Sequence, residues 1–199
     1  MLPGAFLFYS NKVGGTIPTE IGTMNSLTWI DMEDNEITGT IPEELYSNVG
    51  LEQVILKSNA LTGTLSDKVG DLSVVTTFWA SFNQLSGSIP ATLGNCVTLE
   101  ELELQNNALT GPIPTELGNI PTIEFISVEQ NQLTGPIPTE LFSLQALRIL
   151  YINNNQLTGQ IPENYGQSPR LKDLWMNDNL LSGTLPIIAE GEFLFLGES

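Results

Sequence analysis

The sequence predicts an α/β solenoid built from eight coils of 24 residues each. Eight asparagines recur at this spacing without an insertion or deletion: Asn11, Asn35, Asn59, Asn83, Asn107, Asn131, Asn155 and Asn179. Apolar residues stand at fixed places around each asparagine, and a glycine follows four residues after each one. A repeat of roughly 20 to 50 residues is typical of solenoids, whose coils bury their apolar sides against each other.

The coils account for nearly all of the 199 residues, so we predict one domain over residues 1–199. The last residues, 187–199, lose the phase of the repeat and are expected to form an irregular tail. Within that tail, Phe193 to Leu196 are apolar enough to add a last edge strand.

Each coil is expected to contribute a short strand just before its asparagine. Apolar residues stand eight, five and three residues before it, as Leu99, Leu102 and Leu104 do in the fifth coil. A spacing of two is strand periodicity, because alternate side chains point to opposite sides of a strand. Stacked coils would therefore join these strands into a parallel sheet.

The repeated asparagine follows from backbone hydrogen bonding. After the strand the chain must turn inward, which takes backbone amide and carbonyl groups away from water. An asparagine side chain both donates and accepts, so a stacked row can satisfy the turns of adjacent coils. We interpret these residues as structural and not as ligand-binding.

The second half of each coil carries an apolar residue, a glycine and usually Ile-Pro, as in Ile113-Pro114. The glycine suits a backbone conformation or a close approach that a Cβ atom would oppose. Proline is tolerated where its missing N–H has no ladder partner. The third coil differs, with Leu65-Ser66 in place of Ile-Pro.

The segment LEELELQNNALTGPIP at residues 99–114 resembles the 24-residue plant-type leucine-rich repeat, and the resemblance covers essentially residues 3–186. The chain is similar to the ectodomains of receptor-like kinases and receptor-like proteins and to polygalacturonase-inhibitor-like proteins. The resemblance implies a curved right-handed superhelix, with a parallel sheet on the concave face and turns or 3-10 helices on the convex side. It also implies binding of proteins, peptides or glycans on the concave face, at the cell surface or outside the cell.

Several features common in that family are missing from this sequence. There is no paired-cysteine cap, no Asn-x-Ser/Thr sequon, no apolar run long enough to span a membrane and no kinase. Met1 to Tyr9 are apolar but lack a basic region and a cleavage site, so we do not interpret them as a signal peptide. We favour a fragment of a longer chain over end coils that cap themselves, and a cytoplasmic location is the alternative to the cell surface.

The composition of the chain limits the classes of molecule that it is expected to bind. The chain has 23 acidic and 6 basic residues, a net charge of −17 and no histidine. An acidic surface repels phosphate groups, so we expect no nucleic-acid partner and no membrane insertion within this chain. The lack of histidine and the single cysteine, Cys96, argue against a metal site, and we expect no cofactor. Cys96 stands at an apolar position of the repeat and is expected to be buried.

The candidate site consists of strand residues that alternate with the inward ones and of residues beside them. They are Trp29, Asp31, Glu33, Trp79, Phe82, Glu101, Glu103, Phe125, Tyr151 and Trp175. All three tryptophans of the chain stand at positions predicted to be exposed. Exposed aromatic side chains grouped on one surface are typical of interface anchors. The alternative is that they only reflect strand propensity and cross-strand packing.

Two patches are expected within this set. Tyr151 and Trp175 occupy one row on adjacent strands, as do Phe125 and Ile149, while Trp79, Phe82 and Ile55 form a second patch. A neighbouring row turns from acidic to basic along the chain, and Glu124 is expected to pair with Arg148.

These features favour a non-enzymatic binding module for a protein or peptide ligand, with positive charge expected on the ligand. Glycan or cell-wall recognition is the first alternative, because stacked aromatic rings flanked by carboxylates also suit sugars. A glycosidase using two of the carboxylates is disfavoured, since the face is open and lacks an enclosed pocket. A structural or ice-surface role, using the threonine and serine beside each glycine, is a further alternative.

Overall fold

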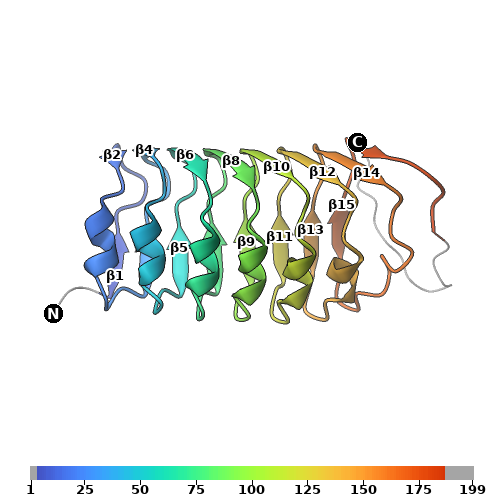
Figure 1. Cartoon of the computed structure of the whole chain (residues 1–199), viewed down its shortest axis with the longest axis horizontal. Coiled ribbons are helices and arrows are strands. Elements are labelled where there is room, and N and C mark those ends of the chain that lie inside the picture. The colour runs from blue at the N-terminus through green and yellow to red at the C-terminus, as the bar shows by residue number, and fades with distance from the viewer. Residues whose placement is uncertain (1–3, 187–199) are drawn as a thin grey trace.

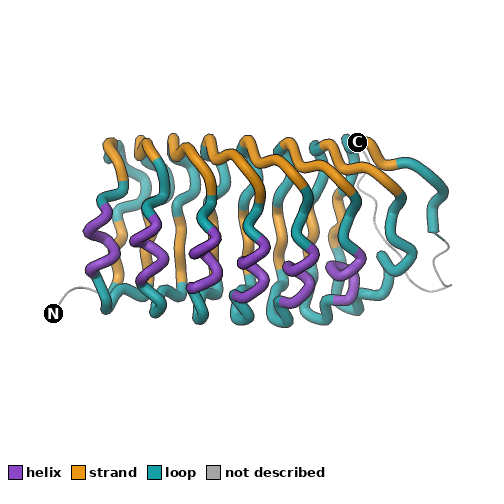
Figure 2. Tube along the Cα trace, in the orientation of Figure 1, coloured by secondary structure: helices purple, strands orange, loops and turns teal. Residues whose placement is uncertain are grey.

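The computed structural model describes residues 4–186, and these form an elongated stack of coils from the N-terminal to the C-terminal end (Figure 1). Each coil runs from a strand of one sheet to a strand of a second sheet and then returns through a 3-10 helix or a turn. Figure 2 shows the helices on one side, the first sheet behind them and the second sheet along one long edge. The predicted tail at 187–199, with its strand at 193–196, lies outside the described residues.

The first sheet is the one predicted from the spacing of apolar residues, and all its strands run parallel. Its strands in the described chain are β1 (Ala5–Leu7), β3 (Trp29–Asp31), β5 (Gln53–Ile55), β7 (Thr77–Trp79), β9 (Glu101–Glu103), β11 (Phe125–Ser127), β13 (Ile149–Tyr151) and β15 (Asp173–Trp175). Neighbouring strands pair residues that are 24 positions apart, such as Glu101 with Phe125. Equivalent positions therefore form straight rows across the sheet.

The second sheet is made by the segment around the repeated glycine. Its strands are β2 (Gly14–Thr16), β4 (Glu36–Gly39), β6 (Ala60–Thr64), β8 (Gln84–Ser88), β10 (Ala108–Gly111), β12 (Gln132–Gly135), β14 (Gln156–Gly159) and β16 (Leu180–Leu181). Gly111 has a φ of 76°, in the left-handed region that a residue with a Cβ atom rarely adopts. The glycine of each coil therefore sets the bend after the strand.

The return side of six coils is a five-residue 3-10 helix, and the equivalent segment of the seventh coil is a turn. The helices in the described part of the chain are η1 (Thr19–Thr23), η2 (Glu43–Ser47), η3 (Asp67–Asp71), η4 (Ala91–Asn95), η5 (Thr115–Asn119) and η6 (Thr139–Ser143). Five of them follow a proline with extended backbone, whose fixed φ prepares the first turn. In the third coil Ser66 replaces that proline, and its hydroxyl accepts a hydrogen bond from the Lys68 backbone N–H.

The core is one apolar column that runs through the coils between the two sheets and the helices. Leu99, Leu102 and Leu104 are fully buried, as their spacing predicts. Cys96 is buried in the same column, and burial raises the pKa of its thiol to about 11. A thiol with so high a pKa is almost entirely protonated at neutral pH, which confirms its role as a small apolar side chain.

The asparagine ladder, defined as the eight repeated asparagines, ties each turn to the coil before it. Asn107 Nδ2 donates to the carbonyl oxygens of Ala80, Leu104 and Gln105 at 3.0, 3.0 and 3.4 Å. Its Oδ1 accepts from the backbone N–H of Leu85 at 2.9 Å. The same pattern recurs at Asn35, Asn59, Asn83, Asn131, Asn155 and Asn179, so the predicted structural role is confirmed.

Replacing Asn107 with alanine should lower the free energy of unfolding by about 2–4 kcal/mol, because three carbonyl oxygens and one N–H lose a buried partner. Equilibrium unfolding in urea measures this change. Asn119→Ala, at the exposed end of η5, is the matched control and should change stability by less than about 0.5 kcal/mol. Equal losses in the two variants would contradict the ladder's role.

Candidate ligand-binding face

The side chains of the first sheet that point away from the core form a continuous surface, here called the first-sheet face. Each coil places three positions on it, two from the strand and one from the turn that follows, as Glu101, Glu103 and Gln105 in the fifth coil. Neighbouring strands of a sheet lie about 4.8 Å apart, so side chains in one row touch across strands. This crowding decides which predicted site residues reach solvent.

Three aromatic side chains near the C-terminal end form what we call the aromatic ladder: Phe125, Tyr151 and Trp175. The Tyr151 and Trp175 rings stack with centroids 4.8 Å apart, tilted by 38°. The Phe125 and Tyr151 rings meet edge to face at 5.8 Å. Trp175 keeps 45% of its surface exposed, and Phe125 lies beside Ile149 in register. The predicted apolar patch across these strands is confirmed.

The other two tryptophans have different surroundings. Trp29 on β3 is exposed at 37%, whereas Trp79 on β7 is half-buried. The Trp79 indole Nε1 is buried without a hydrogen-bond partner. Burial raises the pKa of the nearby Glu101 carboxyl, and the indole N–H offsets part of that rise. The sequence was right that all three lie on the first-sheet face, but only partly right about the exposure of Trp79.

The second predicted patch is not an apolar surface. Ile55 is only 6% exposed, because its neighbours in the row cover it. Phe82 lies in the turn after β7 with a φ of 53°, where the other coils carry Ser, Asp, Asn or Gln, and it is 47% exposed. A bulky side chain in the left-handed region is unfavourable. The Phe82 side chain is not part of the buried core.

Two of the four predicted acids are less accessible than the alternation of the strand suggested. Asp31 and Glu103 lie on the first-sheet face but are only 7% and 8% exposed. The Asp31 carboxylate accepts from the Glu33 backbone N–H at 3.0 Å. The expectation of open, solvated carboxylates is therefore wrong at these two positions, and at Glu103 the side chains of Lys57, Ser81 and Gln105 contact the carboxylate.

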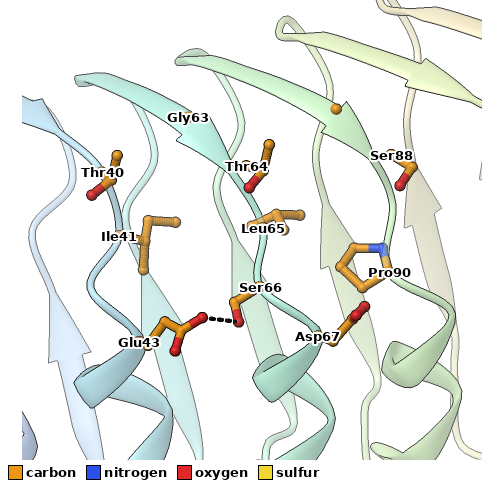
Figure 3. A pocket seen from close by; sticks show the side chains of 11 residues that line it. Thr40, Ile41, Glu43, Gly63, Thr64, Leu65, Ser66, Asp67, Ser88 and Pro90 are labelled. Atoms are coloured by element: carbon orange, nitrogen blue, oxygen red, sulfur yellow. Dashed lines mark hydrogen bonds between the residues drawn. The ribbon is translucent and has the colours of Figure 1, made fainter.

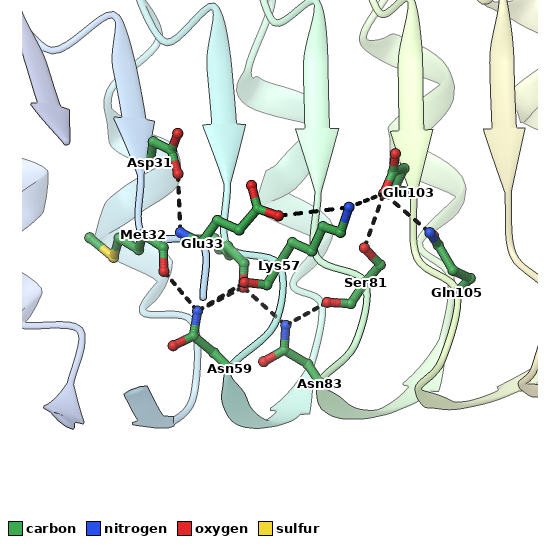
Figure 4. A network of polar contacts seen from close by, with 10 residues as sticks. Asp31, Met32, Glu33, Lys57, Asn59, Ser81, Asn83, Glu103 and Gln105 are labelled. Carbon is green, nitrogen blue, oxygen red and sulfur yellow. Dashed lines mark hydrogen bonds and ion pairs between the residues drawn. The ribbon is translucent and has the colours of Figure 1, made fainter. Parts of the chain in front are cut away.

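A network of polar side chains connects several coils on this face (Figure 4). The Lys57 ammonium lies 3.7 Å from the carboxylates of both Glu33 and Glu103. Ser81 Oγ and Gln105 Nε2 each donate to Glu103 Oε2 at 3.1 Å. Sequence reasoning missed this network. The sequence does contain a signal for this network, because Lys57 is the basic residue in a row whose other members are neutral or acidic.

An open hollow of about 320 Å³ lies on the first-sheet face beside the aromatic ladder. It is lined by Glu101, Glu103, Glu124, Phe125, Arg148 and Ile149. Arg148 Nη1 donates to Glu124 Oε2 at 3.2 Å, which confirms the predicted pair. Burial, and then the nearby charge of Glu103, raise the pKa of Glu101. Burial also raises the pKa of Glu129, partly offset by a hydrogen bond from Ser127.

A second hollow, of about 700 Å³, lies away from this face, beside the second sheet (Figure 3). Thr40, Thr64 and Ser88 line it together with Glu43 and Asp67. Ser66 Oγ donates to Glu43 Oε1 at 3.0 Å, and Lys68 pairs with the same carboxylate at 2.8 Å. The hydrogen bond from Lys68, then the hydrogen bond from Ser66 and the charge of Lys68, lower the pKa of the Glu43 carboxyl. The residues that line this second hollow include no aromatic ring, so the aromatic ladder and this hollow are separate features of the surface.

Comparison with known proteins agrees with this geometry. The sequence profile of the family described as Leucine Rich Repeat matches residues 26–48, 75–96, 98–120 and 146–167. A search of curated proteins gave no match. In the described residues, no helix has the length and apolar character needed to cross a bilayer.

Several solved structures of plant receptors have this fold. The ectodomain of the Arabidopsis thaliana receptor kinase GASSHO1/SCHENGEN3, in complex with CASPARIAN STRIP INTEGRITY FACTOR 2, is 37% identical and covers 89% of this chain, with a TM-score of 0.88. The plant peptide hormone receptor RGFR1, in complex with RGF2, is 33% identical over 92% of the chain, with a TM-score of 0.90. The Arabidopsis receptor kinase HAESA, with the peptide hormone IDA and the co-receptor SERK1, is 30% identical over 92%, with a TM-score of 0.89.

The chain carries leucine-rich repeats in the four matched segments, and its fold is a leucine-rich-repeat solenoid. Its coils are those of the plant type, and it resembles the ectodomains of plant receptor kinases. It covers 21%, 29% and 30% of the three receptor chains. Those structures are receptors or receptor ectodomains in complex with peptides or partner proteins.

Replacing Glu101 with glutamine should stabilise the protein at neutral pH. Its folded-state pKa is raised, so the ionised carboxylate opposes folding above that pKa, and the effect disappears below the usual glutamate pKa of about 4.3. We expect the thermal midpoint to rise by about 1–3 °C at pH 7 and to match the wild type near pH 3.5. Glu163→Gln, an exposed position in the seventh coil, is the control. A midpoint that falls at pH 7 would contradict this prediction.

Proposed function

We propose that this chain is the ligand-binding part of a cell-surface or secreted protein and that it holds a peptide, or an extended segment of a protein, along the first-sheet face. The observation that carries the proposal is the aromatic ladder of Phe125, Tyr151 and Trp175, which crosses three adjacent strands. Aromatic rings bury a large area while losing little side-chain entropy, so they are favourable anchors for a ligand.

The shape of the face favours an extended ligand. The three strands of the ladder span about 10 Å, the length of roughly three residues of extended chain. The neighbouring hollow is open rather than enclosed, and its lining combines one aromatic ring with acidic groups and Arg148. A peptide can place one apolar side chain on the ladder and a polar one in this hollow.

The charge of the face favours a cationic ligand. Glu101 and Glu129 have raised pKa values because burial separates them from water. A basic group near them would stabilise their charged forms and so gain binding free energy. The peptide-bound receptor structures support a peptide over a glycan as the ligand class.

A catalytic role is not part of this proposal. A glycosidase needs one carboxyl group held as a proton donor and a second one facing the same sugar bond. The pKa of Glu101 is raised, but its hollow is open to water on the first-sheet face, which does not isolate a reacting bond.

The combined change Tyr151→Ala and Trp175→Ala should weaken binding at least about tenfold, because it removes two of the three rings of the ladder. Peptides selected by phage display against the wild-type protein are the probe, and calorimetry gives the affinity. Val97→Ala, an exposed apolar residue in the turn before β9, is the control and should leave affinity unchanged.

Circular dichroism should be the same for all three proteins, since the two aromatic side chains lie outside the core. Selected peptides that bind the double variant as tightly as the wild type would refute the site. An oligosaccharide array probed in parallel decides the ligand class, because sugar binding that depends on Trp175 would replace the peptide assignment.

A further inference from the structure

Lys57 crosses the first-sheet face in a way that neither the core nor the coil requires. It stands in the turn after β5, and its side chain reaches across β7 to Glu103 on β9 (Figure 4). Its ammonium group lies 3.7 Å from Glu33 and 3.7 Å from Glu103. It also lies 5.6 Å from the centroid of the Trp79 ring. Two carboxylates and one ring face thus surround a single cation.

The ammonium is held by charge and not by directional bonds. A distance of 3.7 Å exceeds the range of an N–H···O hydrogen bond, which is about 2.7–3.2 Å. The remaining attraction is to the half-exposed Glu33, the buried Glu103 and an aromatic face, and water reaches the ammonium itself, whose side chain is 26% exposed, so it screens part of this attraction. A cation with better geometry can therefore displace it.

The walls around this cation are fixed independently of it. Glu103 Oε2 accepts hydrogen bonds from Ser81 Oγ and Gln105 Nε2, both at 3.1 Å. Ser81 and Gln105 are themselves buried, and Trp79 is half-buried between its neighbours. The carboxylate and the ring would thus keep their positions if the ammonium left. A buried carboxylate left without a counter-charge is unfavourable, so another cation would be drawn in.

A guanidinium group fits these walls better than an ammonium group. It is planar, so it can stack on Trp79, and its fork of N–H donors can hydrogen-bond carboxylates on two sides. An ammonium on a flexible stem offers a point charge and cannot match both contacts.

We propose that Lys57 is an internal placeholder in a cation subsite formed by Trp79, Glu33 and Glu103, and that an arginine side chain of the bound peptide takes its place. The inference rests on the proposed function, because the peptide has to run along the first-sheet face. It adds which side chain the ligand carries and where that side chain sits. Trp79 and Tyr151 are three strands apart, about 14 Å, so the arginine lies about four residues from the side chain on the aromatic ladder.

The test uses a blocked pentapeptide with arginine first, three glycines and phenylalanine fifth, beside versions with lysine or citrulline in place of arginine. Isothermal calorimetry compares the wild type with Lys57→Met and Lys57→Arg. Lys57→Met vacates the subsite and should bind the arginine peptide about tenfold more tightly. Lys57→Arg fills it more firmly and should bind at least about threefold more weakly.

Two controls separate this effect from a general change of charge. Lys68→Met removes the same charge from the exposed pair with Glu43, away from the first-sheet face, and should keep wild-type affinity. The citrulline peptide, similar in shape to the arginine peptide but neutral, should bind all proteins alike. A tenfold gain in both methionine variants would overturn the proposal, because net charge would then explain it.

Lys57→Met binding no more tightly than the wild type would also overturn it. If circular dichroism shows that this variant does not fold, Lys57→Arg decides, and affinity that is unchanged or higher overturns the proposal. Selected peptides that still depend on Tyr151 and Trp175 while Lys57 has no effect would leave the proposed function standing without the placeholder. Loss of that aromatic dependence would remove the proposed function itself.

Discussion

The asparagine ladder is the interaction on which the rest of the structure depends. Each asparagine from Asn35 to Asn179 satisfies three carbonyl oxygens and one N–H group, two of these four in the preceding coil, as Asn107 does. Such a bond set fixes the offset between neighbouring coils, because a shift by one residue would leave buried backbone groups without partners. The absence of any insertion in the eight repeats follows from the same constraint. Strict spacing in sequence thus becomes straight rows in space.

Straight rows explain the chemistry of the first-sheet face. Side chains of one row are about 4.8 Å apart, so each has a neighbour on either side and few are independent. Aromatic residues placed in this way form the ladder of Phe125, Tyr151 and Trp175. Acidic residues placed in this way are partly buried and lie close to one another, so that burial and then the charge of Glu103 raise the pKa of Glu101, while Glu33 and Glu103 gather around Lys57. The apolar and the charged halves of the face have the same geometric origin.

In the function we propose, the two parts of the face have different roles in recognition. The aromatic ladder would offer area to a side chain of almost any apolar kind, whereas the proposed subsite at Trp79 would select for charge and planarity. Their separation is fixed by the sheet, so the proposed ligand is defined by the distance between two side chains rather than by a full sequence. Phe82, in the turn after β7, combines a φ of 53° with an exposed side chain, so packing in the core does not set its conformation.

The sequence by itself determined the number of coils, the parallel first sheet, the buried rows, the asparagine ladder and the Glu124–Arg148 pair. All of these depend on a period, and a period is visible in one dimension. Only the tertiary structure decided which residues of the first-sheet face reach water. Alternation along a strand predicted Asp31, Ile55 and Glu103 to be exposed, yet all three are buried. Lys57 reaches Glu103 across an intervening strand. The physical reason is that exposure depends on the length and direction of side chains in neighbouring coils, which the pattern within one coil does not contain.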